Sequence, residues 1–306
     1  MIVLAMVSVA GRCDAFLRQC LFEAMQRVSV GMGKAEFDMK TRPREILGRF
    51  LGHFHSRQPM AFAAFAIAAA IGSLIAGSPA AAGEPRAVLE LFTSQGCSSC
   101  PAADRLVGEL AKDPSVIALS VPIDYRDYLG WKDTLASPKN TARQRGYARV
   151  RGDRQIYTPQ MVVNGRVHAL GSDRAAIDRA MVASRDDTAM WVPVKVAVTG
   201  GTLNVNIAAQ AGAPPAGEIW LCAVSRHVPV EIAKGENRGH TIVYHNVVRN
   251  WHKLGDWDGK TGSWSVPVTQ FKTGDVDAAA IVVQGGATDR PGAIFGAAFA
   301  ALPAGF

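Results

Sequence analysis

The chain has 306 residues, of which 48% are hydrophobic and 19% are charged. This composition supports a packed core, so it excludes a fully disordered chain, and the length suggests roughly two domains. Most of the net charge of +7 belongs to residues 1–83, which hold nine Lys/Arg and five Asp/Glu and so carry +4. Without a basic stripe interleaved with aromatic residues, we expect no nucleic-acid binding.

Residues 1–82 are predicted to be a leader that carries a signal peptide. An uncharged, Ala-rich stretch at Ala61–Ala76 follows several basic residues and precedes the sequence GSPAAAG. The stretch is shorter than the ~20 residues of a spanning helix, and the layout is typical of secretory signal peptides. We therefore predict cleavage after Ala82, a periplasmic or secreted location, and no stable membrane insertion afterwards. The alternative is an uncleaved membrane anchor.

Residues 83–187 are predicted to form an α/β domain, because apolar runs of strand length alternate with segments of helical character. Strands are predicted at Ala87–Phe92, Val116–Ile123, Gln160–Val163 and Arg166–Leu170. Helical segments are predicted at Ala102–Lys112, at Arg126–Arg149 with a break at Ser137-Pro138, and from a Ser172 cap through Ala183. The dipeptide Asn164-Gly165 is a strong hairpin signal.

Residues 188–306 are predicted to form an all-β, sandwich-like domain of about seven short strands. Apolar and polar residues alternate with the period of two that strands show. The alternating stretches are residues 192–201, 202–210, 218–225, 241–248, 263–268 and 278–284. The domain boundary is expected near residues 186–192. Residues Glu236–Gly239 are interpreted as a loop tip that makes contacts but carries no chemistry.

The most informative motif is QGCSSCP at residues 95–101, in which two serines separate Cys97 from Cys100. A predicted strand precedes it and a predicted helix follows it, so Cys97 is expected at a helix N-terminus. Unpaired N–H groups and the helix dipole favour an anion there, which lowers the pKa of a thiol and increases its nucleophilic thiolate form. We therefore predict that Cys97 is the nucleophile and that Cys100 resolves the mixed disulfide.

The order of these elements resembles the thioredoxin fold over about residues 86–185. In that family an X-Pro bond before a strand is cis, packs against the active-site disulfide, and lies beside the backbone that binds the substrate chain. The resemblance implies this role for Thr158-Pro159 in the sequence YTPQMVVNG. The predicted substrate-binding residues are Thr158, Pro159, Gly96, Ser98 and Ser99.

The motif also departs from typical thioredoxins, which have Trp before the first Cys and Gly-Pro between the two. A buried acid on the preceding strand of that family helps to move the proton of the second Cys, which implies Glu90 as the third catalytic residue here. More closely, ELFTSQGCSSCPAAD with a β-rich tail is similar to a family of secreted proteobacterial thioredoxin-like proteins that is catalogued as a domain of unknown function.

Three interpretations of Cys97 and Cys100 are open at this stage. They form a redox-active pair, a static disulfide of an oxidising compartment, or a Cu(I) site with Met161 or His168 as a further ligand. Cys222 lies in an apolar stretch and is expected to be an inert core thiol; the alternative is pairing between chains. The histidines of the second domain are His227, His240, His245 and His252, and their spacing predicts no zinc site.

The leading hypothesis is an exported thiol–disulfide oxidoreductase that acts on protein or small-molecule disulfides. It needs no organic cofactor, because the dithiol itself carries two electrons. The alternative is a copper-binding or adaptor protein without redox turnover, since a fold by itself does not set a function. Neither the direction of electron flow nor the oligomeric state follows from these residues.

Overall fold

The computed structural model describes residues 85–185, 190, 192–212, 214 and 216–304. The predicted leader and its cleavage site after Ala82 lie outside these residues, as does much of the predicted domain boundary. Within the described part of the chain, no helix is long and apolar enough to cross a membrane.

The described chain is mostly β and is built on one mixed sheet of eight strands. The strand order is β11-β10-β7-β8-β2-β1-β3-β4. Its strands are β1 (Ala87–Thr93), β2 (Val116–Pro122), β3 (Gln160–Val163), β4 (Val167–Leu170), β7 (Gly217–Glu231), β8 (Thr241–Trp257), β10 (Ala278–Ala287) and β11 (Arg290–Ala301). β2 and β8 join in parallel where Ser120 pairs with Val247. The two regions that the sequence separates near residue 187 therefore share a sheet.

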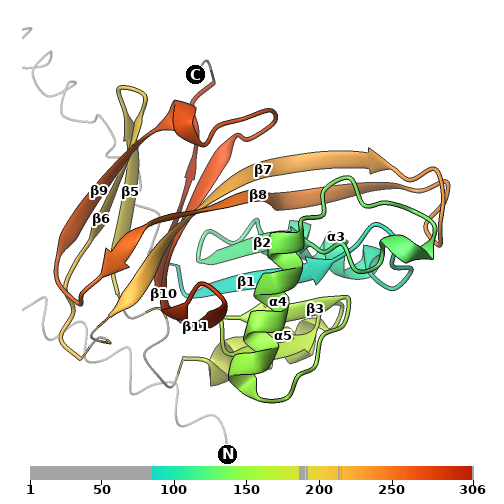
Figure 1. Ribbon diagram of the computed structural model, residues 1–306, viewed down its shortest axis with the longest axis horizontal. Helices are drawn as coiled ribbons and strands as arrows, with labels where there is room; N and C mark the ends of the chain where they lie inside the picture. The colour runs from blue at the N-terminus through green and yellow to red at the C-terminus, as the bar shows by residue number, and fades with distance from the viewer. Residues whose placement is uncertain (1–84, 186–189, 191, 213, 215, 305–306) are drawn as a thin grey trace, which may run out of the picture. The chain divides into compact units, whose positions relative to one another are not determined.

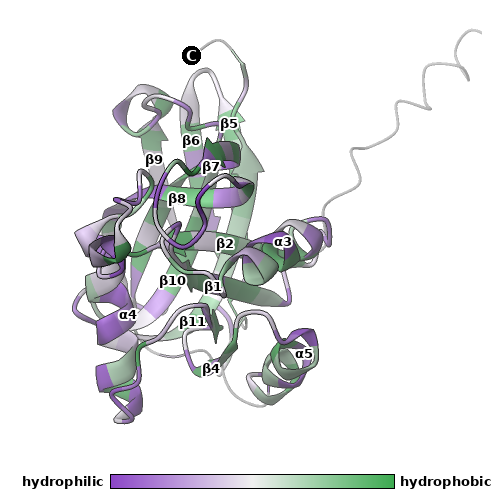
Figure 2. Ribbon diagram, turned by 90° about the vertical axis from the view of Figure 1, so that its right-hand side faces the viewer, coloured by the Kyte–Doolittle hydropathy of each residue, from purple (hydrophilic) through white to green (hydrophobic). Residues whose placement is uncertain are grey.

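Three α-helices cover the half of the sheet formed by β1 to β4. They are α3 (Pro101–Leu110), α4 (Pro138–Arg151) and α5 (Arg174–Ala183). Alternate β1 residues separate the two faces, since Leu89 and Leu91 pack with α3 and α5 whereas Val88 and Phe92 pack with Tyr147 of α4. α4 is strongly polar, as its purple colour in Figure 2 shows, although its sheet side is buried.

A second sheet of three strands, in the order β5-β6-β9, packs on the other half of the large sheet. Its strands are β5 (Val194–Thr199), β6 (Thr202–Ile207) and β9 (Gly262–Pro267). Its apolar residues, such as Leu203 and Val205, share a core with Leu221 of β7 and Ile281 of β10. The period-two pattern of the sequence correctly predicts these half-buried strands.

β7 and β8 form a hairpin of 15- and 17-residue strands that is much longer than the sequence predicts. Its register runs from Gly217 opposite Trp257 to Glu231 opposite Thr241. In Figure 1 both strands extend beyond β10 and over the region of β2 and α3. The hairpin thus carries residues 232–240 from the C-terminal region to the part of the chain that holds the two cysteines.

The helical predictions differ from the structure mainly at helix ends. The segment Arg126–Arg149 divides into a 3-10 turn, η1 (Asp127–Leu129), and α4, which Ser137 caps. α5 is capped by Asp173 instead of the predicted Ser172, because the Asp173 carboxylate accepts a hydrogen bond from Ala176 N at 2.9 Å. A second short 3-10 turn, η2 (Val268–Gln270), follows β9.

Candidate functional site

The Cys-x-x-Cys turn connects β1 to α3, and its two cysteines are buried whereas Ser98 and Ser99 between them are exposed. Cys97 is 4% exposed and Cys100 is fully buried, and both are free thiols. Cys100 is the residue that precedes the first helical turn, and its N–H donates to Cys97 O at 3.1 Å. Cys97 therefore lies in the tight turn just before the helix, with its sulfur directed toward the amino end of α3.

Hydrogen bonds to the Cys97 sulfur favour its thiolate. The Cys100 thiol is the strongest of these influences and, together with the Ser99 hydroxyl at 3.3 Å, lowers the pKa of Cys97 to about 5 although partial burial acts in the opposite direction. When the Cys97 sulfur carries its proton, it donates to Thr158 O at 3.7 Å. Cys97 therefore has the more acidic thiol of the pair.

Cys100 has the opposite character, and a buried carboxyl lies close enough to influence it. Burial raises the pKa of Cys100, and the negative charges of Cys97 and Asp104 raise it further. Asp104, one turn along α3, is fully buried and accepts a hydrogen bond from Thr93 Oγ1 at 2.7 Å. Burial, and then the charge of Cys97, raise the pKa of Asp104 to about 8.

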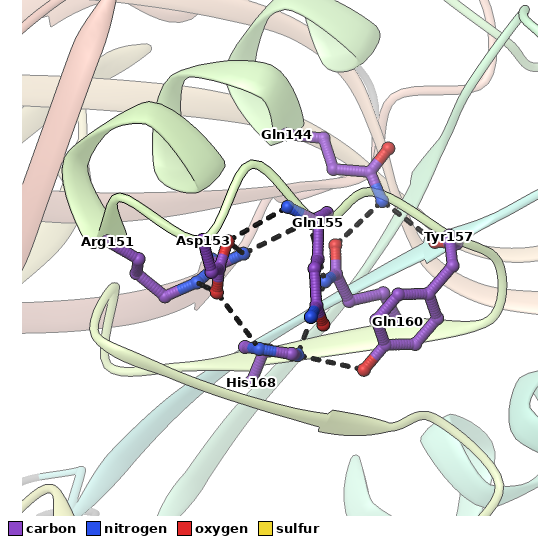
Figure 3. Close-up of polar contacts among 7 residues, drawn as sticks. All are labelled: Gln144, Arg151, Asp153, Gln155, Tyr157, Gln160 and His168. Atoms are coloured by element: carbon purple, nitrogen blue, oxygen red, sulfur yellow. Dashed lines mark hydrogen bonds and ion pairs between the residues drawn. The ribbon is translucent and has the colours of Figure 1, made fainter.

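The Thr158-Pro159 bond is cis and lies against Cys97, as the resemblance implies. Figure 3 shows the polar network that holds the chain on both sides of this bond. Gln144 Nε2 of α4 donates to Tyr157 O and to Gln160 Oε1, both at 2.8 Å. The Tyr157 hydroxyl lies 2.8 Å from His168 Nδ1, so the segment is fixed before and after the proline.

The loop after β2 closes a second side of the turn. Asp133 Oδ2 accepts a hydrogen bond from Gln95 N at 2.8 Å, and Trp131 Nε1 donates to Gln95 Oε1 at 2.7 Å. Arg126 Nε donates to Thr158 Oγ1 at 3.1 Å. A Cβ added at Gly96 would lie 3.3 Å from Arg126 O, so glycine permits this close approach.

The tip of the β7–β8 hairpin covers the turn from a third side. Asn237 Nδ2 donates to Gln95 O at 2.8 Å and to Cys97 O at 2.9 Å, and Asn237 is buried. Beside it, Glu236 Oε2 accepts a hydrogen bond from Ser98 N at 3.0 Å. The loop tip that the sequence interprets as a contact region therefore contacts the Cys-x-x-Cys turn itself.

Glu90 lies on the opposite face of β1 from the helix that follows the cysteines. Its Oε1 accepts hydrogen bonds from Arg143 Nε at 2.9 Å and Arg143 Nη2 at 2.7 Å. Arg143 in turn donates to Tyr147 and Gln284. This placement is at odds with the predicted catalytic role of Glu90, because strand residues alternate between faces and the carboxyl that interacts with Cys100 is Asp104 instead.

Met161 and His168, the possible further ligands of a Cu(I) site, contact other groups of the protein. Met161 is fully buried in the core between β1, α3 and α5. His168 uses Nδ1 toward Tyr157 and Nε2 toward Asp153 Oδ2 at 3.2 Å. Across the described ranges, no group of three or more His, Cys, Asp and Glu residues is arranged to hold a metal ion. Cys222 is fully buried, and burial raises its pKa.

Fold and site together define a mostly β protein with a Cys-x-x-Cys turn at the amino end of a helix, in which both cysteines are buried. The chain belongs to the family described as a protein of unknown function, DUF1223, whose model matches residues 88–284. The matched region includes both the cysteine turn and the β7–β8 hairpin that covers it.

Two solved structures are similar to this chain. A crystal structure of a protein from Agrobacterium tumefaciens has 33% sequence identity and a TM-score of 0.63, and the match covers 72% of this chain and 95% of that one. HBP35 of Porphyromonas gingivalis has 15% identity and a TM-score of 0.48, with coverage of 72% and 76%. No curated protein matches this chain.

Proposed function

We propose that this protein is a thiol–disulfide oxidoreductase that uses Cys97 and Cys100. The observation that carries the proposal is the placement of the two thiols. Cys97 lies in the turn before α3, with its sulfur 3.3 Å from Ser99 Oγ and 3.7 Å from Thr158 O beside the cis proline. These surroundings lower the pKa of Cys97 to about 5, whereas burial raises that of Cys100. A thiolate nucleophile beside a protonated partner is the arrangement that disulfide exchange needs. A structural disulfide has no need of such a contrast.

In the reducing direction, the Cys97 thiolate attacks one sulfur of a substrate disulfide. An S–S bond forms to Cys97 as the substrate bond breaks, and the departing substrate thiolate takes a proton. Cys100 then loses its proton to the Asp104 carboxylate and attacks Cys97 Sγ. As the Cys97–Cys100 bond forms, the bond between Cys97 and the substrate breaks, and the second substrate thiolate leaves and takes the proton from Asp104. The products are a Cys97–Cys100 disulfide and two substrate thiols, so two electrons pass to the substrate. The oxidising reaction is the reverse.

The proposed fold and location agree with this chemistry. We further propose a thioredoxin-like unit at residues 85–185, supported by its order of strands, helices and a cis proline. We propose a sandwich-like unit at residues 192–304, supported by the packing of the small sheet on β7, β10 and β11. We place the protein in the periplasm or outside the cell, on the strength of the signal-peptide pattern in the leader. Its partners are protein or small-molecule disulfides.

The test is the reduction potential of the Cys97–Cys100 pair in metal-free protein. The protein is equilibrated in glutathione buffers of graded ratio, and its free thiols are counted by mass spectrometry. A potential between about −120 and −270 mV, the span of known dithiol oxidoreductases, is the expected result.

A potential below about −300 mV contradicts the proposal, because it indicates a stable structural bridge. Stoichiometric copper in protein isolated from its own compartment contradicts it in favour of the metal-binding alternative. The Cys97→Ser variant is the control, since it retains Cys100 and Cys222 but cannot form the pair.

A further inference from the structure

A groove of about 670 Å³ runs between α3 and the beginning of β8 and ends at the cysteine turn. One wall is a single face of α3 and the turn after it, with Pro101, Arg105, Gly108 and Lys112 at helical spacing. Ser98, which lies between the two cysteines, lines the end of the groove. A volume of this size is within the range of ligand-binding clefts, about 300–1,000 Å³.

The other wall of the groove is the edge of a strand. β8 pairs with β7 along its length, but its pairing with β2 is confined to Val247. The groove is lined by Thr241 and Val243 of β8, for which no second strand partner exists in the described part of the chain. An open strand edge binds an extended chain through main-chain hydrogen bonds, so this wall fits a peptide segment.

Positive charge faces the groove from the α3 wall. Arg105 and Lys112 are exposed and form no ion pair within the described ranges, whereas Arg86, Arg174 and other surface cations of the protein do. The opposite wall contains His240 and His245, and burial lowers the pKa of His245, so this ring is neutral at neutral pH. Glu109 is the acidic residue of the lining. The excess of cationic side chains favours an anionic occupant.

The end of the groove at the cysteine turn already holds a carboxylate. Glu236 Oε2 accepts the Ser98 N–H, and this contact lowers the pKa of Glu236. Glu236 is an exposed side chain of the hairpin tip, so a carboxylate from another molecule has access to the same donor. An acidic side chain near the substrate cysteine is therefore able to bind this donor in place of Glu236.

We propose that the groove between α3 and the open edge of β8 binds an extended, acidic segment of the substrate protein. The segment adds to β8 as a short strand, its acidic side chains meet Arg105 and Lys112, and its cysteine lies toward Ser98 and Cys97. This inference rests on the proposed function for the identity of the substrate, but the binding itself requires no redox chemistry.

The experiment measures binding of fluorescent, thiol-free, ten-residue peptides to the reduced full chain by fluorescence anisotropy. One peptide carries Glu at alternate positions and its partner carries Gln at the same positions. We expect the acidic peptide to bind about fivefold more tightly or better, in proportion to two exposed ion pairs, and to weaken as salt is raised.

Two double variants test the location. Arg105→Gln with Lys112→Gln is expected to abolish the preference for the acidic peptide. Arg179→Gln with Lys195→Gln removes the same charge from exposed positions outside the groove and is expected to retain it. An acidic peptide N-methylated at alternate residues is expected to lose binding, because it cannot pair with the edge of β8.

Equal binding of the Glu and Gln peptides overturns the proposal, as does equal loss in both double variants. The Cys97→Ser, Cys100→Ser variant separates it from the proposed function. If this variant binds the acidic peptide while the reduction potential indicates a structural bridge, then the groove inference stands and the oxidoreductase proposal fails. If the potential is that of an oxidoreductase but no peptide binds, only the groove inference fails.

Discussion

Asp104 has no exposed surface, and its Oδ2 atom has no hydrogen-bond partner among the described residues. Burial raises its pKa to about 8, so it is able to accept and release a proton near neutral pH. Cys100 must lose a proton before it attacks Cys97, and the two groups interact electrostatically. Asp104 is therefore the group in the described structure that best fits the transfer of this proton.

We predict that Asp104→Asn slows the release of the second substrate thiol by about tenfold or more, the lower range of general-base effects. In the unmodified protein this step should accelerate as the pH rises through about 8, where Asp104 ionises. The variant should lack that rise. Single-turnover release of substrate thiol across the pH range measures it.

The same substitution has a signed effect on stability. Asp104 has a higher pKa in the folded protein, about 8, than in the unfolded chain, about 3.9. Its contribution to the free energy of unfolding is therefore fully present below the unfolded pKa and is lost as the pH rises through the folded pKa. Asp104→Asn should therefore gain stability relative to the unmodified protein at pH 9 but not at pH 4, as measured by urea unfolding. Asp178→Asn, on the exposed side of α5, is the control. Identical pH profiles for the Asp104 variant and the unmodified protein would contradict the proposed role.

At the residue scale, local motifs could be predicted and long-range placements could not. The positions of Cys97 and Cys100 follow from a short motif between a strand and a helix. Asp104 is not among the predicted site residues, although its place four residues after Cys100 puts both on one helical face. Glu90 is predicted because it is the acidic residue nearest to the cysteines on the preceding strand. Its distance from Cys100 depends on which helix covers each face of β1, and the sequence near Glu90 does not contain that information.

At the scale of elements, the tip of the β7–β8 hairpin holds the cysteine turn through the buried amide of Asn237 and the exposed carboxylate of Glu236. We predict that Asn237→Ala costs about 1–2 kcal/mol of unfolding free energy, because two carbonyls lose their buried donor. It should also speed the alkylation of Cys97, since the turn is less well covered. Arg238→Ala, an exposed neighbour in the same tip, should change neither quantity. Unchanged alkylation in Asn237→Ala would show that the tip does not restrict access to Cys97.

The buried ion pair between Glu90 and Arg143 links β1, α4 and β10. We predict that Glu90→Gln lowers the unfolding free energy by about 3 kcal/mol, because it leaves a buried guanidinium without its countercharge. It should leave the pH dependence of Cys97 alkylation unchanged. Arg174→Gln breaks an exposed pair with Asp178 and should cost less than about 1 kcal/mol. An altered alkylation profile in Glu90→Gln would restore its predicted catalytic role.

Element positions were predicted well where burial alternates and poorly where strands leave the core. The period-two pattern identifies β5, β6 and β9, whose apolar faces pack on the large sheet. It misses the outer part of the hairpin, where residues such as Arg226 and His227 are exposed. These positions are strands because β7 and β8 pair with each other, and pairing between distant segments leaves no local pattern.

At the scale of the whole described chain, the large sheet joins the regions that composition separates. The change from helical to alternating patterns near residue 187 marks a change of local structure. It does not mark an end of the sheet, since β8 pairs with β2 and the core that contains Val88 of β1 also contains Cys222 of β7. A shared core predicts that both regions unfold in one cooperative step.

Cys222 provides a reporter for this prediction, because its thiol is fully buried in the shared core. In a Cys97→Ser, Cys100→Ser background, brief thiol labelling at increasing urea should modify Cys222 only where the sheet unfolds. A second chain with Cys222→Ser and Ala180→Cys places the reporter on α5, in the other region. The two labelling midpoints should coincide with each other and with the loss of circular dichroism. Two separate midpoints would instead show independent domains, divided near residue 187 as the sequence pattern suggests.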